Sequence, residues 1–206
     1  MADARVFHWL RSLAIPHWLL LALAAGLLCF MHLRAPLQEP QEARYAEIPR
    51  QMLAEGSWLT PILHGQPYYD KPPLFYWLVM ASYSVCGVHD WAARWLACAL
   101  AWGCILVAYA WGRAVLPARA ALLGGLMLCL SPRFLQLDRM VTMDGLLCLC
   151  VTAAWASAHR ALRGPQLHRG WWLLSALATG LGLLTKGPIA LVLFVPPVLA
   201  LRWLDP

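Results

Sequence analysis

The sequence contains few charged residues for its length. Asp, Glu, Lys and Arg make up 13% of the 206 residues, whereas hydrophobic residues make up 61%. A soluble domain typically carries roughly 25% charged residues. The mean hydropathy is accordingly high, at +0.59. The composition therefore argues against a soluble domain and predicts a membrane protein.

The basic residues form no cluster. The net charge is +6, but Lys and Arg occur singly and scattered, without the run or stripe that marks a nucleic-acid-binding surface. The seven cysteines lie almost all in apolar segments, and the spacing of Cys148 and Cys150 is wrong for a zinc knuckle. We interpret them as small buried hydrophobic residues. No internal repeat and no low-complexity segment is present, and we expect no nucleic-acid partner.

Six apolar segments approach the length of a transmembrane helix. A helix needs about 20 predominantly apolar residues to cross the hydrocarbon core. The first segment follows Arg5 and Arg11 and lacks a small-x-small cleavage site, so we expect a retained anchor rather than a signal peptide. The predicted fold is an all-α membrane protein of about six transmembrane helices. They lie at about 15–33, 91–112, 117–132, 141–162, 170–185 and 188–203, with residues 1–14 cytoplasmic and helices two to six within 91–206.

The distribution of charge orients these helices. With the amino terminus inside, each face receives eight of the 16 basic residues, so the positive-inside rule does not decide by count. The inner connections 113–119 and 160–169 are short and basic. The outer basic residues lie among all the carboxylates except Asp3 and Asp205. These two observations favour an amino terminus inside and place segment 34–90 outside.

The outer segment has structure of its own. Apolar residues interleave with charged ones over 42–54, which is typical of an amphipathic helix in the membrane interface. Pro49 would kink or break this helix, and Gly56 would end it. Pro73 suits the first turn of a second helix that runs to about Cys86. With about 12 apolar residues this helix is short for a span, so we expect it to be interfacial or re-entrant.

Ionisable side chains beside a bilayer are costly and therefore suggest a functional site. Glu42 and Tyr45 are three residues apart and share a helix face; the alternative is a solvated face with local ion pairs. In Asp70-Lys-Pro-Pro73 the prolines fix the backbone after a charged pair. Lys71 could bind a lipid phosphate, and Asp70 could orient that lysine or bind a metal ion. The alternative is an ordinary interfacial lysine.

Two more candidates lie later in the chain. Asp144 is near the outer start of the fourth span, where a carboxylate should face protein or water rather than lipid; the alternative is a pairing with Arg133 or Arg139. Lys186 precedes Gly187-Pro188, and a lysine beside a helix amino terminus makes an anion site; the alternative is a turn with an interfacial lysine. Together the candidates offer carboxylates as bases and cations for phosphate, which transfer from a phosphate-linked donor requires.

These segments resemble a family of membrane glycosyltransferases. The family is the GT-C group that uses polyprenyl-phosphate sugars and includes the dolichyl-phosphate-mannose protein mannosyltransferases. The most similar branch is that of the bacterial 4-amino-4-deoxy-L-arabinose (lipid A) transferases. The resemblance runs from about Pro36 to Pro188. It rests on Glu42-Ala-Arg-Tyr-Ala-Glu47, Gln51-Met-Leu-Ala-Glu-Gly-Ser-Trp58, Gly65-Gln-Pro-Tyr-Tyr-Asp-Lys-Pro-Pro-Leu74 with Trp77, Ala93-Arg94, Asp144 and Leu184-Thr-Lys-Gly187.

The resemblance implies a fold and a reaction. The fold would be a GT-C helix bundle with interfacial helices in the first extracytoplasmic loop. The protein would be an inverting glycosyltransferase of the bacterial inner membrane with its active face in the periplasm. It would move a sugar from undecaprenyl phosphate to lipid A or another lipid or protein acceptor of the envelope.

The resemblance also implies roles for individual residues. By match to the family's motifs, Lys71 would hold the donor phosphate and Asp70 would lie at a divalent metal ion. Arg44 and Tyr45 would line the donor or acceptor cavity. The remaining substrate-binding candidates are Tyr68 and Lys186.

The chain departs from the family pattern in two ways. An aspartate usually stands where this chain has Gln41, and a glutamine cannot act as a base. Either Glu42 takes over, or Asp144, which matches a second acidic position, carries the chemistry, or the site is weakened. Family members also have about twice as many spans and end in a periplasmic domain. We therefore expect a fragment, or a split subunit that a second polypeptide completes.

Two other functions fit parts of the sequence. Gln41 and the short length would suit a non-catalytic lipid-phosphate-binding protein or subunit derived from this family, which binds donor lipid without turnover. A transporter or channel fragment would use its intramembrane charges as a pathway. Transporter sites lie near the bilayer midplane, whereas the charges here gather at one face, which argues against that function.

Overall fold

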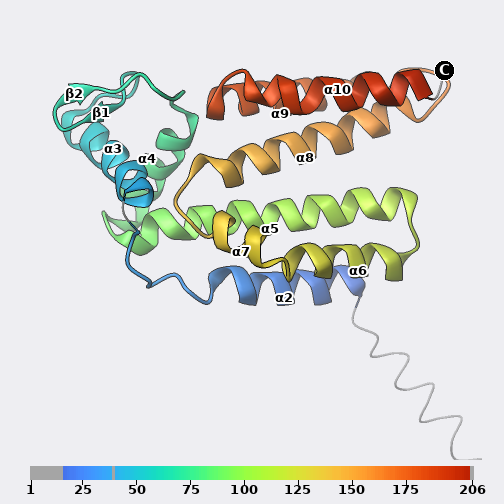
Figure 1. The fold of residues 1–206 in the computed structure, drawn as a ribbon, viewed down its shortest axis with the longest axis horizontal. Helices are drawn as coiled ribbons and strands as arrows, with labels where there is room; N and C mark the ends of the chain where they lie inside the picture. The colour runs from blue at the N-terminus through green and yellow to red at the C-terminus, as the bar shows by residue number, and fades with distance from the viewer. Residues whose placement is uncertain (1–15, 39, 205–206) are drawn as a thin grey trace, which may run out of the picture.

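A computed structural model describes residues 16–38 and 40–204, which form a layered helical bundle (Figure 1). The predicted cytoplasmic segment 1–14 lies outside the described residues. Two very short strands accompany the helices. The elements are α2 (His17–Phe30), α3 (Gln41–Glu55), β1 (Ile62–Leu63), β2 (Gln66–Pro67), α4 (Leu74–Cys86), α5 (Asp90–Val115), α6 (Ala118–Cys129), α7 (Pro132–Asp138), α8 (Met143–Leu162), α9 (Arg169–Lys186) and α10 (Ile189–Leu204).

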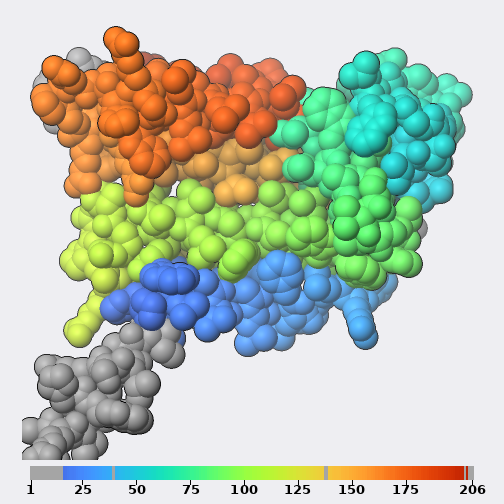
Figure 2. Space-filling view, turned by 180° about the vertical axis from the view of Figure 1, so that it is seen from behind, coloured from blue at the N-terminus to red at the C-terminus, as the bar shows by residue number. Residues whose placement is uncertain are grey.

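The longer helices lie side by side in layers. Helices α5 and α8 pack together in the middle, with α2 and α6 against α5, and α9 and α10 against α8 (Figure 1). Figure 2 shows the same order of layers from behind. The elements α3, β1, β2 and α4 cover one end of the bundle, and we call them the cap. The α5–α6 and α8–α9 connections lie at the opposite end, which we call the far end (Figure 1).

Prolines stand at the starts of most helices. A proline fixes φ near its helical value and lacks an N–H that the first turn could not pair in any case. Gly56 ends α3 as predicted, in the left-handed conformation at φ 66°. The prolines just before or at a helix start are Pro16 for α2, Pro40 for α3, Pro73 for α4, Pro117 for α6, Pro132 for α7 and Pro188 for α10.

The observed helices occupy the positions of the predicted spans, but two of them are clearly shorter. Helix α2 ends at Phe30 rather than at 33. Helix α6 ends at Cys129 rather than at 132, because Pro132 begins the separate helix α7. Its 12 residues are about 18 Å long, less than the roughly 30 Å hydrocarbon thickness. By length and apolarity, two helices of the described part of the chain, α5 and α8, could cross a membrane. The count of six spans stays a prediction.

The cap differs from its prediction in two places. A kink or a break was predicted at Pro49; helix α3 continues through this residue, so a break is wrong. Pro49 is buried between Ile48 and Met52, on the side that packs against α4, and this packing holds the turn that has lost a hydrogen bond. Strands β1 and β2 form a hairpin that the all-α prediction did not include. Its turn residues, His64 and Gly65, both have positive φ, which is the requirement of a two-residue hairpin turn.

A hydrophobic core joins the cap to the bundle. Phe75, Tyr76 and Met80 of α4 are fully buried, and they pack with residues of α3, α5 and α8. Each such side chain contributes about 1.5–3 kcal/mol when it leaves water. The predicted helix 74–86 therefore exists with the expected bounds, and it is attached to the bundle over its buried face.

We expect Gly182→Val to destabilise the bundle. A Cβ at this position would lie 3.0 Å from the Cβ of Ala190, on α10, and 3.6 Å from the Cβ of Cys150, on α8. Overpacking of this kind costs about 1–3 kcal/mol. Gly180→Val is the matched control, because a Cβ there meets nothing within 4 Å. Thermal melting in detergent should show a lower Tm for Gly182→Val alone; equal melting of the two variants would contradict the packing.

Candidate functional site

Glu42 lies in a fully buried position at the base of the cap. It belongs to the first turn of α3 and is 0% exposed. Its Oε2 accepts hydrogen bonds from the Arg94 Nη2 at 3.1 Å and from the Gln38 backbone N–H at 2.8 Å. Its Oε1 accepts from the Val141 backbone N–H at 2.8 Å. Both carboxylate oxygens are therefore engaged inside the protein. The alternative of a solvated helix face is wrong for Glu42.

Arg94 completes this buried pair. The guanidinium, on the first turns of α5, is 5% exposed and also donates to the Pro36 carbonyl at 3.0 Å and the Arg139 carbonyl at 3.4 Å. The pair therefore links the segment before α3 to α3 itself, to α5 and to the connection before α8. In the sequence Arg94 is noted only as part of the family resemblance, and nothing there indicates its partner.

Lys71 and Lys186 line one cavity between the cap and the α9–α10 connection. The cavity has a volume of about 450 Å³, and Tyr68 and Asp70 also line it. We call it the polar cavity. The two lysines come from segments that are far apart in sequence. Lys71 follows the hairpin, while Lys186 is the last residue of α9, before Gly187 (φ 73°) turns the chain into α10. The fold thus brings four of the predicted site residues to one place.

Asp70 is held by two neighbours. Lys71 Nζ lies 3.2 Å from its Oδ2, and the Tyr68 hydroxyl donates to the same oxygen at 3.1 Å. The hydrogen bond from Lys71, and then that from Tyr68, lower the pKa of Asp70, and the same contact raises the pKa of Lys71. Burial and the Asp70 carboxylate raise the pKa of Tyr68 against the opposing effect of Arg44. At neutral pH the cavity wall thus presents an ammonium, a carboxylate and a neutral phenol.

Asp144 pairs with Lys186. The Lys186 Nζ donates to the Asp144 Oδ1 at 2.5 Å, and both side chains are partly exposed. Asp144 lies in the first turn of α8, and its partner lies 42 residues later in the chain. Asp144 thus pairs with this lysine rather than with a nearby arginine, which was the alternative. The position of Lys186 at the carboxyl end of α9 also suits a cation.

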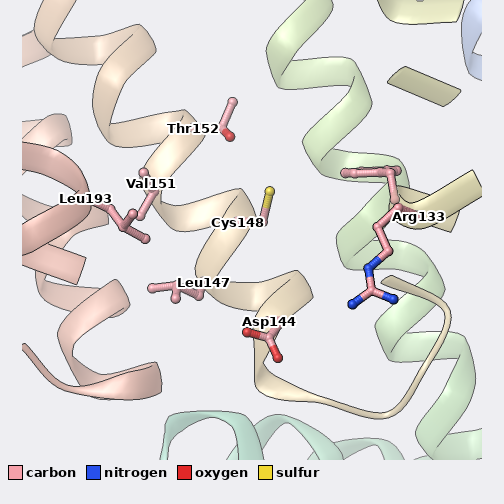
Figure 3. A pocket seen from close by; sticks show the side chains of 8 residues that line it. Arg133, Asp144, Leu147, Cys148, Val151, Thr152 and Leu193 are labelled. Atoms are coloured by element: carbon pink, nitrogen blue, oxygen red, sulfur yellow. The ribbon is translucent and has the colours of Figure 1, made fainter. Parts of the chain in front are cut away.

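Asp144 lines a second cavity, of about 390 Å³, between α7, α8 and α10. Figure 3 shows Asp144 at one end of a row of α8 residues, with Arg133 of α7 on the facing wall. Leu147, Val151 and Leu193 make the rest of the lining largely apolar. Because Asp144 lines this cavity and Lys186 lines the polar one, their ion pair belongs to the walls of both.

Arg44 and Tyr45 have different surroundings. Arg44 is exposed and lines a third cavity, of about 300 Å³, together with Glu47 and His64. Tyr45 is half-buried, with ring centroids 6.5 Å from Phe75 and 6.3 Å from Tyr76. Arg44 therefore faces solvent beside the Tyr68 end of the polar cavity, whereas Tyr45 belongs mainly to the packing of the cap. Gln41 is exposed one turn earlier.

A divalent metal ion was predicted at Asp70. In the described residues no group of three His, Cys, Asp or Glu side chains could hold such an ion. The Asp70 carboxylate is already engaged by Lys71 and Tyr68. The residues around Asp70 do not fit a metal held by protein ligands alone, so we derive no step from one, and the metal stays a prediction.

Known proteins resemble this chain over most of its length. A family model described as dolichyl-phosphate-mannose-protein mannosyltransferase matches residues 70–204. An undecaprenyl phosphate-alpha-4-amino-4-deoxy-L-arabinose arabinosyl transferase of Sodalis glossinidius is 36% identical over 172 residues, which cover 80% of this chain and 30% of that protein. Its counterpart in Aeromonas salmonicida is 34% identical over 175 residues, which cover 81% and 32%.

A solved structure shares the fold. The crystal structure of ArnT from Cupriavidus metallidurans bound to undecaprenyl phosphate matches with a TM-score of 0.81 and 29% sequence identity, over 92% of this chain and 36% of that chain. The chain thus spans about a third of the length of these relatives.

We expect removal of Arg94 to destabilise the protein strongly. Arg94→Leu leaves the Glu42 carboxylate buried without its cation, which costs about 3–5 kcal/mol. The matched control is Arg50→Leu, because Arg50 forms an exposed pair with Glu47 at 2.6 Å, and such pairs contribute about 1 kcal/mol or less. Denaturation in detergent would measure the free energy of unfolding of both variants. Equal losses of stability would show that the buried pair does not hold the fold more strongly than the exposed pair.

We expect Lys71→Met to raise the pKa of Asp70. The folded protein holds this pKa below its ordinary value, so the stabilisation by the pair is present at neutral pH and is lost as the pH falls through the folded pKa. Carboxyl ¹³C NMR of an aspartate-labelled chain, with Asp70→Asn for assignment, would measure the shift. An unchanged pKa would contradict the contact.

Proposed function

We propose that this chain, which belongs to the dolichyl-phosphate-mannose-protein mannosyltransferase family, is the donor-binding part of a membrane glycosyltransferase. The donor would be a sugar linked to undecaprenyl phosphate, and the acceptor would be lipid A or another envelope molecule. The observation that carries the proposal is the polar cavity with Lys71 and Lys186 in its wall. The name of the matching structure, which includes undecaprenyl phosphate, supports this choice of ligand.

Two ammonium groups on one cavity suit a phosphate. Lys71 stays charged because Asp70 raises its pKa. Lys186 approaches from the end of α9, so the two cations reach the ligand from different elements. In the reaction they would stabilise the negative charge that develops as the polyprenyl phosphate departs. The cavity beside Arg133, with its apolar lining, would take part of the lipid chain.

Asp144 is the better candidate for the base. Glu42 is fully buried, and its two oxygens accept three hydrogen bonds from protein groups. Asp144 is partly exposed, lines the neighbouring apolar cavity, and pairs with Lys186, which lines the polar cavity. We therefore assign Glu42 to positioning the cap and Asp144 to the chemistry.

The proposed transfer balances without a further reactant. An acceptor oxygen attacks the anomeric carbon of the sugar from the face opposite the phosphate, and a new C–O bond forms. The bond between that carbon and the phosphate oxygen breaks, and the polyprenyl phosphate leaves with the electron pair. Where the acceptor is a hydroxyl, Asp144 would take its proton. Arg44, on the solvent side of Tyr68, would face the acceptor.

The proposal includes a place in the cell. The cap would lie on the periplasmic face of a bacterial inner membrane, and six helices would cross it with the amino terminus inside. The apolar helices α5 and α8 support a membrane location. Because the chain spans about a third of its relatives, a further polypeptide segment would complete the acceptor side.

A second candidate function is binding of the lipid phosphate without turnover. Gln41, an amide at the position where the family usually has an aspartate, favours it. The two functions share the donor site and differ only in whether sugar is transferred.

Binding of undecaprenyl phosphate by the purified chain tests the shared site. Lys71→Ala and Lys186→Ala should each weaken binding about tenfold or more, as expected for a charged hydrogen bond to phosphate. Arg119→Ala, an exposed cation at the far end, is the control and should bind normally. Unchanged binding in the double lysine variant would sink the proposal. A transfer assay with labelled sugar would then separate the two functions. Transfer by the parent chain that Asp144→Asn abolishes would favour the glycosyltransferase, and binding without transfer would favour the non-catalytic protein.

A further inference from the structure

A small apolar cavity lies at the far end of the bundle. Its volume is about 230 Å³. It shares no lining residue with the cavities at the cap end, so it is separate from the donor site. It is lined by Trp111 of α5, Trp155 of α8 and Pro197, Val198 and Leu201 of α10.

Two buried polar atoms beside this cavity lack a partner. The Trp155 Nε1 and the His159 Nδ1 are buried and have no hydrogen-bond partner among the described residues. They lie one turn apart on α8, and their rings meet Trp111 at centroid distances of 6.2 and 6.1 Å. A buried N–H without an acceptor is costly in a native protein. Trp155, which itself lines the cavity, therefore points to an acceptor atom that a ligand would supply.

The surroundings are positively charged. The segments 108–122, 155–172 and 197–204 meet at this end, and they contain arginines but no Asp or Glu. Arg113 donates to the Leu116 carbonyl, Arg163 donates to the Ala114 carbonyl, and Arg160 lies 4.7 Å from the Trp171 ring centroid. These partners are all uncharged. The far end therefore carries positive charge that no carboxylate of the described residues neutralises.

We propose that this end of the bundle binds an anionic phospholipid. An acyl chain enters the cavity beside Val198, an ester or phosphate oxygen accepts the hydrogen bond of the Trp155 N–H, and the headgroup lies among the arginines. A soluble anion would fit the charge but has no part to fill an apolar cavity. Arginine and tryptophan at the ends of apolar helices also suit the level of the lipid headgroups.

The test uses the whole 206-residue chain, purified in detergent and delipidated. Native mass spectrometry would measure retention of phosphatidylglycerol and of phosphatidylethanolamine, offered separately. Phosphatidylglycerol should be retained several-fold more. Trp155→Phe, which keeps an aromatic ring and removes the N–H, should weaken its binding about fivefold, as expected for one hydrogen bond. Val198→Phe, which fills the cavity, should weaken it at least as much.

The controls separate this site from general effects of charge and folding. Arg119→Gln removes a far-end cation of α6, which packs against α2 and α5, whereas Arg160 and Arg163 lie at the end of α8 beside Trp155; this variant should retain phosphatidylglycerol like the parent chain. If Val198→Phe does not fold, as judged by circular dichroism, Arg160→Gln with Arg163→Gln replaces it and should abolish the preference for phosphatidylglycerol. Equal retention of the two lipids by the parent chain, unchanged binding in a folded Val198→Phe, or full competition by inorganic phosphate would overturn the proposal. Because no sugar donor is used, the result does not depend on the proposed transfer reaction.

Discussion

The buried ion pair between Glu42 and Arg94 is the interaction on which the arrangement of the cap depends. Removing two charges from water is costly, and the cost is offset only when hydrogen bonds satisfy both groups. Here backbone groups of Gln38 and Val141 complete the carboxylate, and the carbonyls of Pro36 and Arg139 accept from the two Nη atoms of the guanidinium, whose Nε alone is buried without a partner among the described residues. One pair thus fixes four segments at once. The cap can occupy only one position on the bundle while these bonds are kept.

The polar cavity follows from that position. Lys71 belongs to the cap and Lys186 to the bundle, so the distance between the two cations depends on how the cap is placed. If the cap could move relative to α9, Lys71 and Lys186 would not stay on the same cavity. In the proposed reaction Glu42, one of the two acidic candidates of the sequence, would therefore act indirectly, by holding one wall of the cavity against the other.

Much of the fold could be predicted from local signals. Gly56 ends α3, Pro73 precedes α4, and the apolar segments give helices at the expected positions, because each signal acts on neighbouring residues. The continuation of α3 through Pro49 could not be predicted, since tertiary packing of buried neighbours outweighs a missing hydrogen bond. The hairpin was also missed, although His64-Gly65 is compatible with its turn.

The candidate site was predicted less completely. The sequence identified Lys71, Asp144 and Lys186 as chemically interesting, but not which charges meet. Arg94 lies 52 residues from Glu42, and Lys186 lies 42 residues from Asp144. A one-dimensional pattern shows that a charge in an apolar segment needs a partner, and only the folded chain selects it. The role expected of Glu42 depended on that selection.

The uneven distribution of acids has an electrical consequence. The far end carries arginines without described carboxylates, whereas acids and bases alternate at the cap end, so the bundle has a charge gradient along its long axis. A membrane potential that is negative on the cytoplasmic side acts on this gradient at about 2.3 kcal/mol per elementary charge for each 100 mV. In an energised membrane the voltage itself would therefore favour one insertion of the bundle, with the arginines inward, and would oppose its inversion.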